Sequence, residues 1–150
     1  MGNLYAESGL IPNNLENTYS TRFRLTDVQY TQKVDNGSYT NFAKDGAGYG
    51  LAQWTYWTRK QNLLNFAKSK NKSIADLEMQ LEFLVKELKE NYTNSVYMIL
   101  KNAKTILEAS NAVLLKFERP ANQSIAVQAQ RAALGKKYYD QYGANNKNTV

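Results

Sequence analysis

The side chains available for chemistry in this chain are carboxylates, because the 150-residue sequence contains neither histidine nor cysteine. That composition excludes Ser-His-Asp and Cys-His nucleophilic machinery, and it excludes zinc sites built from His or Cys ligands. Zinc amidases, zinc endopeptidases and cysteine peptidases are therefore ruled out among enzymes that degrade bacterial walls. Acid-base cleavage of a glycosidic bond needs only Asp and Glu side chains, so this chemistry remains open.

Glu7 is the carboxylate with the most informative setting. It lies in the run LYAESG at residues 4–9, and it is followed by the glycine-rich, aromatic-flanked run DGAGYGLAQW at residues 45–54. A carboxylate combined with such a turn suggests cleavage of a polysaccharide. The alternative is that Glu7 is an ordinary solvent-facing glutamate at a helix end, which is the usual situation for an isolated Glu.

The glycine-rich run is a poor phosphate-binding loop, since no Lys-Ser pair follows it and no strand-loop-helix pattern surrounds it. Its glycines would instead allow the backbone to approach a sugar chain closely, with Gln53 donating hydrogen bonds to an N-acetyl or hydroxyl group. Aromatic side chains could stack on pyranose rings, namely Tyr49, Trp54, Tyr56 and Trp57. Ordinary core packing is the alternative for both tryptophans.

These residues must be positioned by predicted helices, which stand on both sides of an irregular segment. Met1–Ser8 reads as the end of a helix terminated by Gly9, and Thr26–Asp35 reads as a short helix capped by Thr26. Residues 36–57 are rich in Gly, Tyr, Trp and Thr, which predicts a loop with a small β-hairpin. Such irregular segments often carry function.

From Thr58 onward the apolar pattern predicts successive helices. The first ends near Lys70, and Ser73, with Asp76 three residues later, resembles the capping box of a longer helix. A core-facing stripe is predicted on that helix, comprising Leu77, Leu81, Leu84 and Leu88, together with Met79 and Phe83. Further helices are expected at Val96–Leu100, from the Thr105 cap to Phe117 before Pro120, and from about Ser124 to Tyr142.

The charge balance points to an anionic environment, with 19 basic and 13 acidic residues and a formal net charge of +6. The lysines are scattered along predicted helix faces instead of forming one arm or recognition helix, which favours an ordinary solvated surface with a mild basic bias over a nucleic-acid partner. The functional alternative is attraction of this surface to a polyanionic cell wall. No apolar run is long enough to span a bilayer, and no membrane partner is expected.

Three motifs together resemble one known family: ESG at 7–9, GAGYGLAQW at 46–54 and FERP at 117–120. In this order they are similar to the phage tail lysozyme domain family of the lysozyme-like superfamily, over essentially the whole chain. The Glu-Ser and Gly-Leu-x-Gln elements also look like those of goose-type lysozymes and soluble lytic transglycosylases, in which the residue at Ala52 is usually Met. The resemblance implies a mainly α-helical lysozyme-like catalytic domain at 1–143, with the glycine-rich loop or hairpin at its cleft. A polar tail or linker follows at 144–150.

The resemblance also implies catalytic roles. Glu7 would be the general acid that protonates the glycosidic oxygen, and it must then stay protonated near neutral pH through desolvation by apolar neighbours. Asp45 would be the second, water-activating carboxylate, although its spacing to the Gly-Leu-x-Gln element is one residue shorter than in goose-type lysozymes. Asp35 is the rival for that role, and an Asp before Gly is also common in turns. Residues expected to bind substrate are Ser8, Tyr49, Gln53, Trp54, Glu118 and Tyr139.

The implied function is that of a muramidase, a lysozyme-type glycoside hydrolase that cleaves the β-1,4 bond between N-acetylmuramic acid and N-acetylglucosamine with no cofactor and no metal. A lytic transglycosylase, which forms 1,6-anhydromuramic ends, is the nearest alternative. Another is a catalytically silent wall-binding or tail-assembly module, since the resembling domains usually begin with a helix upstream of the residues matching Met1–Leu4. The expected partners are peptidoglycan strands and other domains of a longer phage tail or conjugation-associated protein. The expected location is extracellular, at the bacterial cell wall.

Overall fold

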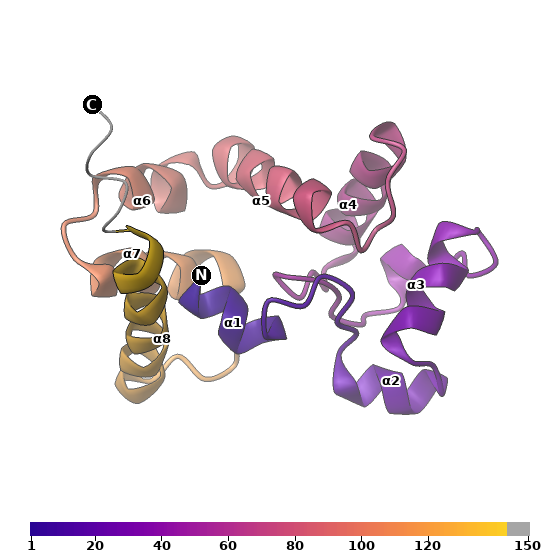
Figure 1. Cartoon of the computed structure of the whole chain (residues 1–150), viewed down its shortest axis with the longest axis horizontal. Helices are drawn as coiled ribbons and strands as arrows, with labels where there is room; N and C mark the ends of the chain where they lie inside the picture. Colours follow the sequence, from indigo (N-terminus) through magenta and orange to yellow (C-terminus); the bar gives the residue numbers. More distant parts are fainter. Residues whose placement is uncertain (144–150) are drawn as a thin grey trace. The chain divides into compact units, whose positions relative to one another are not determined.

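Helices make up almost all of the regular structure in residues 1–143, the part of the chain that the computed structural model describes (Figure 1). β-Structure in this part is limited to isolated bridges around Tyr49. The predicted mainly α-helical class is thereby confirmed, whereas the predicted tail at 144–150 lies outside the described residues. No helix in this part of the chain is long and apolar enough to cross a membrane.

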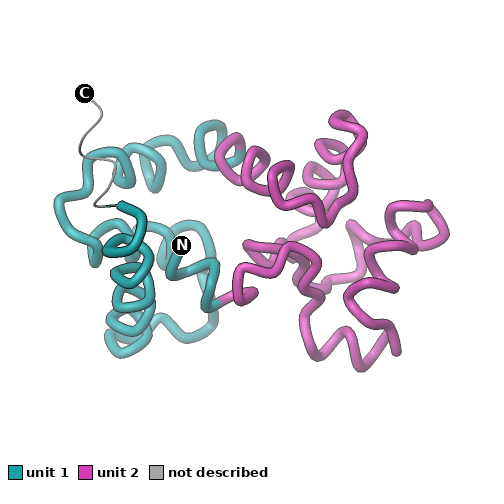
Figure 2. The backbone as a smooth tube through the Cα atoms, in the orientation of Figure 1, with its two compact units in different colours: residues 1–6, 87–150 teal, residues 7–86 magenta. Residues whose placement is uncertain are grey.

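The chain divides into two compact units, which Figure 2 shows in different colours. One is continuous and is called here the Glu7–Lys86 unit. The other, called the terminal unit, combines Met1–Ala6 with the residues from Glu87 onward. The boundaries fall inside helix α1 (Gly2–Ser8) and helix α5 (Leu77–Asn91).

The remaining elements follow in chain order. Between α1 and α5 lie α2 (Asn17–Phe23), α3 (Asp27–Asp35), the 3-10 turn η1 (Phe42–Lys44) and α4 (Trp57–Ser69). After α5 come the π-helical segment η2 (Thr93–Tyr97), α6 (Met98–Asn102), α7 (Ile106–Ala112), the π-helical segment η3 (Val113–Glu118), α8 (Ile125–Tyr138) and the π-helical segment η4 (Tyr139–Gly143).

Local capping explains several helix starts. Thr26 and Gln29 form a reciprocal capping box at α3, and the Thr105 hydroxyl accepts the Glu108 N–H at the start of α7, so both predicted caps are confirmed. The predicted Ser73 cap of α5 is wrong, because Asp76 Oδ1 accepts the Met79 N–H at 2.9 Å there instead. No sequence pattern predicted α2, which is a short polar helix without buried residues.

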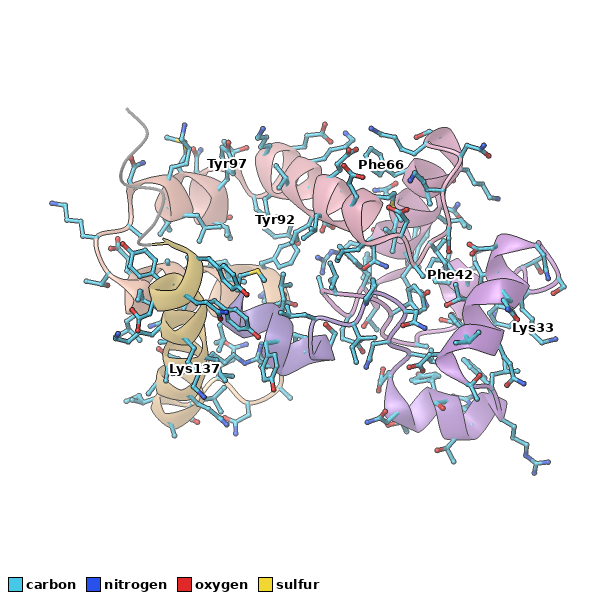
Figure 3. All side chains as sticks on the ribbon, in the orientation of Figure 1. Lys33, Phe42, Phe66, Tyr92, Tyr97 and Lys137 are labelled. Carbon is cyan, nitrogen blue, oxygen red and sulfur yellow. The ribbon has the colours of Figure 1, made fainter. Side chains whose placement is uncertain are left out.

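The core of the Glu7–Lys86 unit is aromatic. Tyr30, Phe42 (labelled in Figure 3), Tyr49 and Trp54 are all fully buried, and the Phe42 ring meets the Tyr49 ring edge-on with centroids 5.6 Å apart. Such edge-to-face pairs match the positive ring edge to the negative ring face. Tyr49 and Trp54 belong to the glycine-rich run, so the run itself is anchored in this core.

The predicted stripe on α5 needs correction. Leu77 and Leu81 are 51% and 40% exposed, whereas Met79 and Phe83 are buried together with Leu84 and Leu88. The buried face of α5 therefore begins at Met79 and not at Leu77. Met79 and Phe83 are four residues apart, so they lie on the same side of the helix. Phe83 packs edge-on against Trp54 at 5.5 Å.

The terminal unit has a smaller core of its own. Val96, Leu114 and Phe117 are buried, and Tyr92 (labelled in Figure 3) meets Phe117 edge-on with ring centroids 5.1 Å apart. Gly2 packs directly against the backbone of α8, where a Cβ would overlap atoms of Arg131 and Gly135. The start of α1 is thus fitted closely to α8.

Candidate active site

Glu7 occupies the penultimate position of α1, and the helix ends there for a backbone reason. Gly9 and Leu10 both have φ of 64°, the left-handed conformation that commonly terminates helices. The Glu7 side chain is half-buried and its Oε1 atom is buried. The next residue, Ser8, is buried and donates its hydroxyl to the carbonyl oxygen of Leu51 at 2.9 Å. This bond ties the end of α1 to the glycine-rich loop.

The glycine-rich loop is held by backbone pairing on both sides. Leu15 forms an antiparallel bridge with Tyr49, and Tyr49 forms a second one with Trp54. The Tyr49 and Trp54 N–H groups donate to each other's carbonyls at 3.2 and 3.0 Å. The predicted β-hairpin is therefore present only as a single bridged pair that closes the turn.

A buried amide fixes the middle of this loop. Gln80 is fully buried on α5, and its Oε1 accepts the Leu51 N–H at 2.9 Å. Its Nε2 donates to the carbonyls of Pro12 and Ile74, each at 2.6 Å. Gly50 has φ of 76°, and a Cβ there would lie 2.7 Å from Gln80 Oε1, so glycine is required both by the backbone and by the neighbouring amide. Gln80 was not among the predicted site residues, since nothing in the sequence distinguishes it from a surface glutamine on a helix.

Asp45 is enclosed by donors from the protein itself. Its Oδ1 lies 2.5 Å from Lys60 Nζ and accepts the Ala47 N–H at 2.9 Å. Its Oδ2 accepts the hydroxyls of Tyr30 and Tyr39 at 2.5 and 3.1 Å. Both carboxylate oxygens are thus engaged, which differs from the setting of a carboxylate that must hold an attacking water. The geometry of Asp45 suits a structural ion pair at the base of the loop.

Burial and the Asp45 charge shift the groups in this cluster. Burial lowers the pKa of Lys60, while its hydrogen bond to Asp45 opposes that shift. Burial and the neighbouring Asp45 raise the pKa of Tyr39 to about 12 and raise that of Tyr30 further. Lys60 also donates to the Ala47 carbonyl at 2.7 Å and lies over the Phe42 ring. No sequence signal marked this lysine as buried.

Asp35, the rival for the second carboxylate, also has a local structural task. It accepts the Ser73 hydroxyl at 2.5 Å and the Ile74 N–H at 3.0 Å. These bonds join the end of α3 to the segment that leads into α5. Neither of these bonds joins Asp35 to the glycine-rich loop.

Two of the residues expected to bind sugar belong to the core. Tyr49 and Trp54 are fully buried, with the Tyr49 hydroxyl bonded to Thr31 Oγ1 at 2.6 Å, so neither ring presents a face for a pyranose. Ser8, equally buried, uses its hydroxyl on Leu51. Gln53 uses its Nε2 on the chain itself, donating to the Asn14 carbonyl and Oδ1 and to the Gly50 carbonyl.

The exposed aromatic residues in this region are their neighbours. Tyr56 and Trp57 are 63% and 51% exposed at the start of α4, with ring centroids 6.4 Å apart. Of the four aromatic residues considered as sugar platforms, these two are accessible. In the chain they lie between Trp54 and Lys60, which are both buried, so the segment that carries the two exposed rings is held in the core at both ends.

Glu16 is a carboxylate at the loop that no sequence motif contains. Its Oε2 accepts the Gly48 N–H at 3.0 Å, and its backbone N–H donates to the Gly48 carbonyl at 2.9 Å. A Cβ at Gly48 would lie 2.7 Å from Gln53 Oε1 and 3.3 Å from both Glu16 Oε2 and Thr55 Oγ1. Three side-chain oxygens therefore converge above a glycine. Only the acidic nature of Glu16 could have drawn attention to it in the sequence.

The remaining predicted residues lie in the terminal unit. Glu118 ends η3, is half-buried, and is followed by Arg119 in the left-handed conformation with φ of 51°. Tyr139 starts η4, is 44% exposed, and lines a cavity of about 380 Å³ together with Tyr138 and Tyr142. Within residues 1–143, no group of three or more acidic side chains is placed to hold a metal ion.

Comparison with known protein families gives a match over nearly the full chain. The family described as phage tail lysozyme matches residues 1–142. Neither a curated protein nor a solved structure matches the chain.

Proposed function

Because the chain belongs to the phage tail lysozyme family, we propose that it is a muramidase in which Glu7 is the general acid. Membership of this family indicates a lysozyme-like, peptidoglycan-degrading function and a virion-associated protein that acts on the cell wall. The proposal adds the bond cleaved, which is the β-1,4 linkage between N-acetylmuramic acid and N-acetylglucosamine. It also adds that water is the acceptor.

The placement of Glu7 is the observation that carries the proposal. A general acid must be partly withdrawn from water and held at a defined position relative to the bound sugar. Glu7 is half-buried, and Ser8 next to it is bonded to Leu51 of the glycine-rich loop. The loop is in turn fixed by Gln80. A rigid support of this kind suits proton delivery to the glycosidic oxygen.

Substrate binding is proposed along the same loop. The exposed Tyr56 and Trp57 rings follow the loop directly in the chain and offer accessible aromatic faces beside it. A pyranose presents C–H groups that pack against aromatic faces, and its hydroxyl and N-acetyl groups seek hydrogen-bond partners. The family match makes the glycan strands of peptidoglycan the proposed polymer.

A lytic transglycosylase is the second candidate, and the engagement of Asp45 favours it. In that reaction the muramic acid 6-hydroxyl replaces water, so no second carboxylate is needed to hold a water. Asp45 is bound by Lys60, Tyr30 and Tyr39, and this setting suits a structural role better than the role of that second carboxylate. The hydrolase proposal therefore depends on another group for this task.

The decisive experiment is mass spectrometry of cell walls digested by the purified chain. Reducing muramic acid ends support the muramidase, and 1,6-anhydro ends support the transglycosylase and overturn the hydrolase. Glu7→Gln should abolish wall lysis while the circular dichroism spectrum is kept. Glu78→Gln, at an exposed position of α5, is the matched control and should lyse walls at the normal rate. Unchanged lysis by Glu7→Gln would remove Glu7 from the mechanism.

A further inference from the structure

We propose that Glu16 is the carboxylate that takes the proton from the attacking water, an inference that rests on the proposed muramidase function. In this scheme the water oxygen forms a bond to the anomeric carbon of N-acetylmuramic acid. The bond from that carbon to the leaving oxygen breaks, Glu7 gives its proton to this oxygen, and Glu16 receives the proton of the water. The outcome is hydrolysis with inversion at the anomeric carbon.

The two oxygens of Glu16 are used differently, which separates it from Asp45. Oε2 is oriented by the Gly48 N–H, while Oε1 accepts no hydrogen bond from any protein group in residues 1–143. A general base needs this combination of a fixed position and an accepting atom left for the water. Asp45 lacks it, since both of its oxygens accept protein donors.

The surroundings of Glu16 can orient a small donor. Gln53 Oε1 and Thr55 Oγ1 lie with Glu16 Oε2 around the position that a Cβ at Gly48 would take, at 2.7, 3.3 and 3.3 Å from it. Thr55 donates its hydroxyl proton to the Gln53 carbonyl at 2.8 Å, so its oxygen is left as an acceptor. A water or a sugar hydroxyl next to Glu16 would find acceptors on more than one side.

Glu7 and Glu16 are attached to the same short stretch of loop. Ser8, which follows Glu7, is bonded to Leu51, and Glu16 is bonded to Gly48. Three residues of chain span about 10 Å at most. The residue after Glu7 and the carboxylate of Glu16 are thus anchored to neighbouring positions of one loop, and inverting glycosidases hold their two carboxyls about 6.5 to 9.5 Å apart around a water.

Glu16→Gln separates catalysis from loop support, because the amide oxygen of glutamine still accepts the Gly48 N–H. We expect hydrolysis to fall by about 10²- to 10⁴-fold, the usual contribution of a general base, with an unchanged thermal midpoint. Azide, a nucleophile that needs no base, should restore turnover and yield a glycosyl azide of inverted, α configuration. Activity of Glu16→Gln within about twofold of the unmodified chain would overturn the proposal.

A second experiment uses the unmodified chain, so its result does not depend on whether a variant folds. Proton NMR during digestion of a soluble glycan oligomer by the unmodified chain should show the α anomer first. A β anomer or a 1,6-anhydro product would overturn the role of Glu16. Glu7→Gln tests the function on which this inference rests: it should be inactive and should not recover with azide, since the acid is missing. If Glu7→Gln stays active, the proposed function fails; if only Glu16→Gln does, the inference alone fails.

Discussion

Lys60 Nζ lies 2.5 Å from Asp45 Oδ1, and both side chains are withdrawn from solvent, with exposures of 0% and 1%. The pair sits at the foot of the glycine-rich loop, where Lys60 also donates to the Ala47 carbonyl. A buried ion pair is costly to break, because removal of one partner leaves an uncompensated charge in a site shielded from solvent. The fold of the loop therefore depends on this ion pair. From the sequence alone, Asp45 would be assigned to catalysis and Lys60 to the surface.

Removing one charge of this pair should destabilise the protein strongly. Lys60→Met leaves Asp45 without its cation, and we expect the free energy of unfolding to fall by about 3 to 5 kcal/mol. Urea titration followed by circular dichroism measures this loss. In the double variant Asp45→Asn/Lys60→Met the loss should be smaller than the sum of the single losses, because no lone charge stays buried. Additive losses would show that the two side chains are not coupled.

The same variants test the role of Asp45 in the reaction. If Asp45 is structural, Asp45→Asn should lower wall lysis only as far as it lowers the folded fraction, so both Asp45→Asn and the double variant should keep normal activity per folded molecule. An Asp45→Asn chain that is folded but more than about 10²-fold slower would instead support the catalytic role predicted from sequence.

The two tyrosines that donate to Asp45 should make the fold sensitive to alkali. The pKa of Tyr39 is raised to about 12 and that of Tyr30 is raised further, by burial and by Asp45, from a reference of 10.0. The stability that these protonated hydroxyls provide is fully present below pH 10.0 and is lost as the pH rises through the folded-state pKa of Tyr39, because the unfolded chain ionises first. The urea midpoint should therefore fall above pH about 10.

A matched variant isolates this effect. Tyr39→Phe removes one raised group and should flatten the alkaline decline, whereas Tyr142→Phe, at a residue 60% exposed in the terminal unit, should leave it unchanged. Tyrosinate ultraviolet absorbance reports the ionisation directly. An equal decline in all three proteins would contradict the assignment.

Gln80 should contribute far more to the free energy of unfolding than a glutamine on a helix surface usually does. Gln80→Ala removes the acceptor of the Leu51 N–H and the donor to Pro12 and Ile74, and it leaves a cavity. We expect a loss of about 2 to 4 kcal/mol in the free energy of unfolding, since buried polar groups are left unpaired. The control Gln32→Ala, at an exposed position of α3, should change stability by less than about 0.5 kcal/mol. Equal effects in urea titrations would exclude the bracing role of Gln80.

The two tryptophans should report on different parts of the molecule. Trp54 is fully buried and Trp57 is 51% exposed, so acrylamide should quench the fluorescence of Trp54→Phe, which retains Trp57, much more than that of Trp57→Phe. If the glycan lies along the loop, a soluble peptidoglycan oligomer should protect Trp57 in Trp54→Phe from acrylamide. Binding without protection would place the glycan elsewhere. The experiment is best made with Glu7→Gln added, so that the oligomer is not digested.

Much of the helical framework could be predicted from the sequence, for physical reasons that act locally. Caps at Thr26, Thr105 and Ser124 depend on side chains that bond the backbone three residues on, and Gly9 terminates α1 through its own conformation. The absence of histidine and cysteine restricts the available chemistry by composition alone. The motif-bearing Glu7 also lies at the end of α1, as its helical context predicted.

Only the tertiary structure determined which polar side chains hold distant segments together by hydrogen bonds and which stay accessible to solvent. Glu16, Lys60 and Gln80 are ordinary charged or amide residues in the sequence, and Asp45 stood out there only as a catalytic candidate. The roles of all four depend on partners from distant segments: Lys60 contacts Asp45, Gln80 accepts the Leu51 N–H, and Glu16 accepts the Gly48 N–H. The same holds for the tryptophans, since Trp54 is covered by Phe83 and Trp57 is not buried. Local sequence sets propensity and capping, whereas burial and long-range hydrogen bonds arise only when the chain has folded around them.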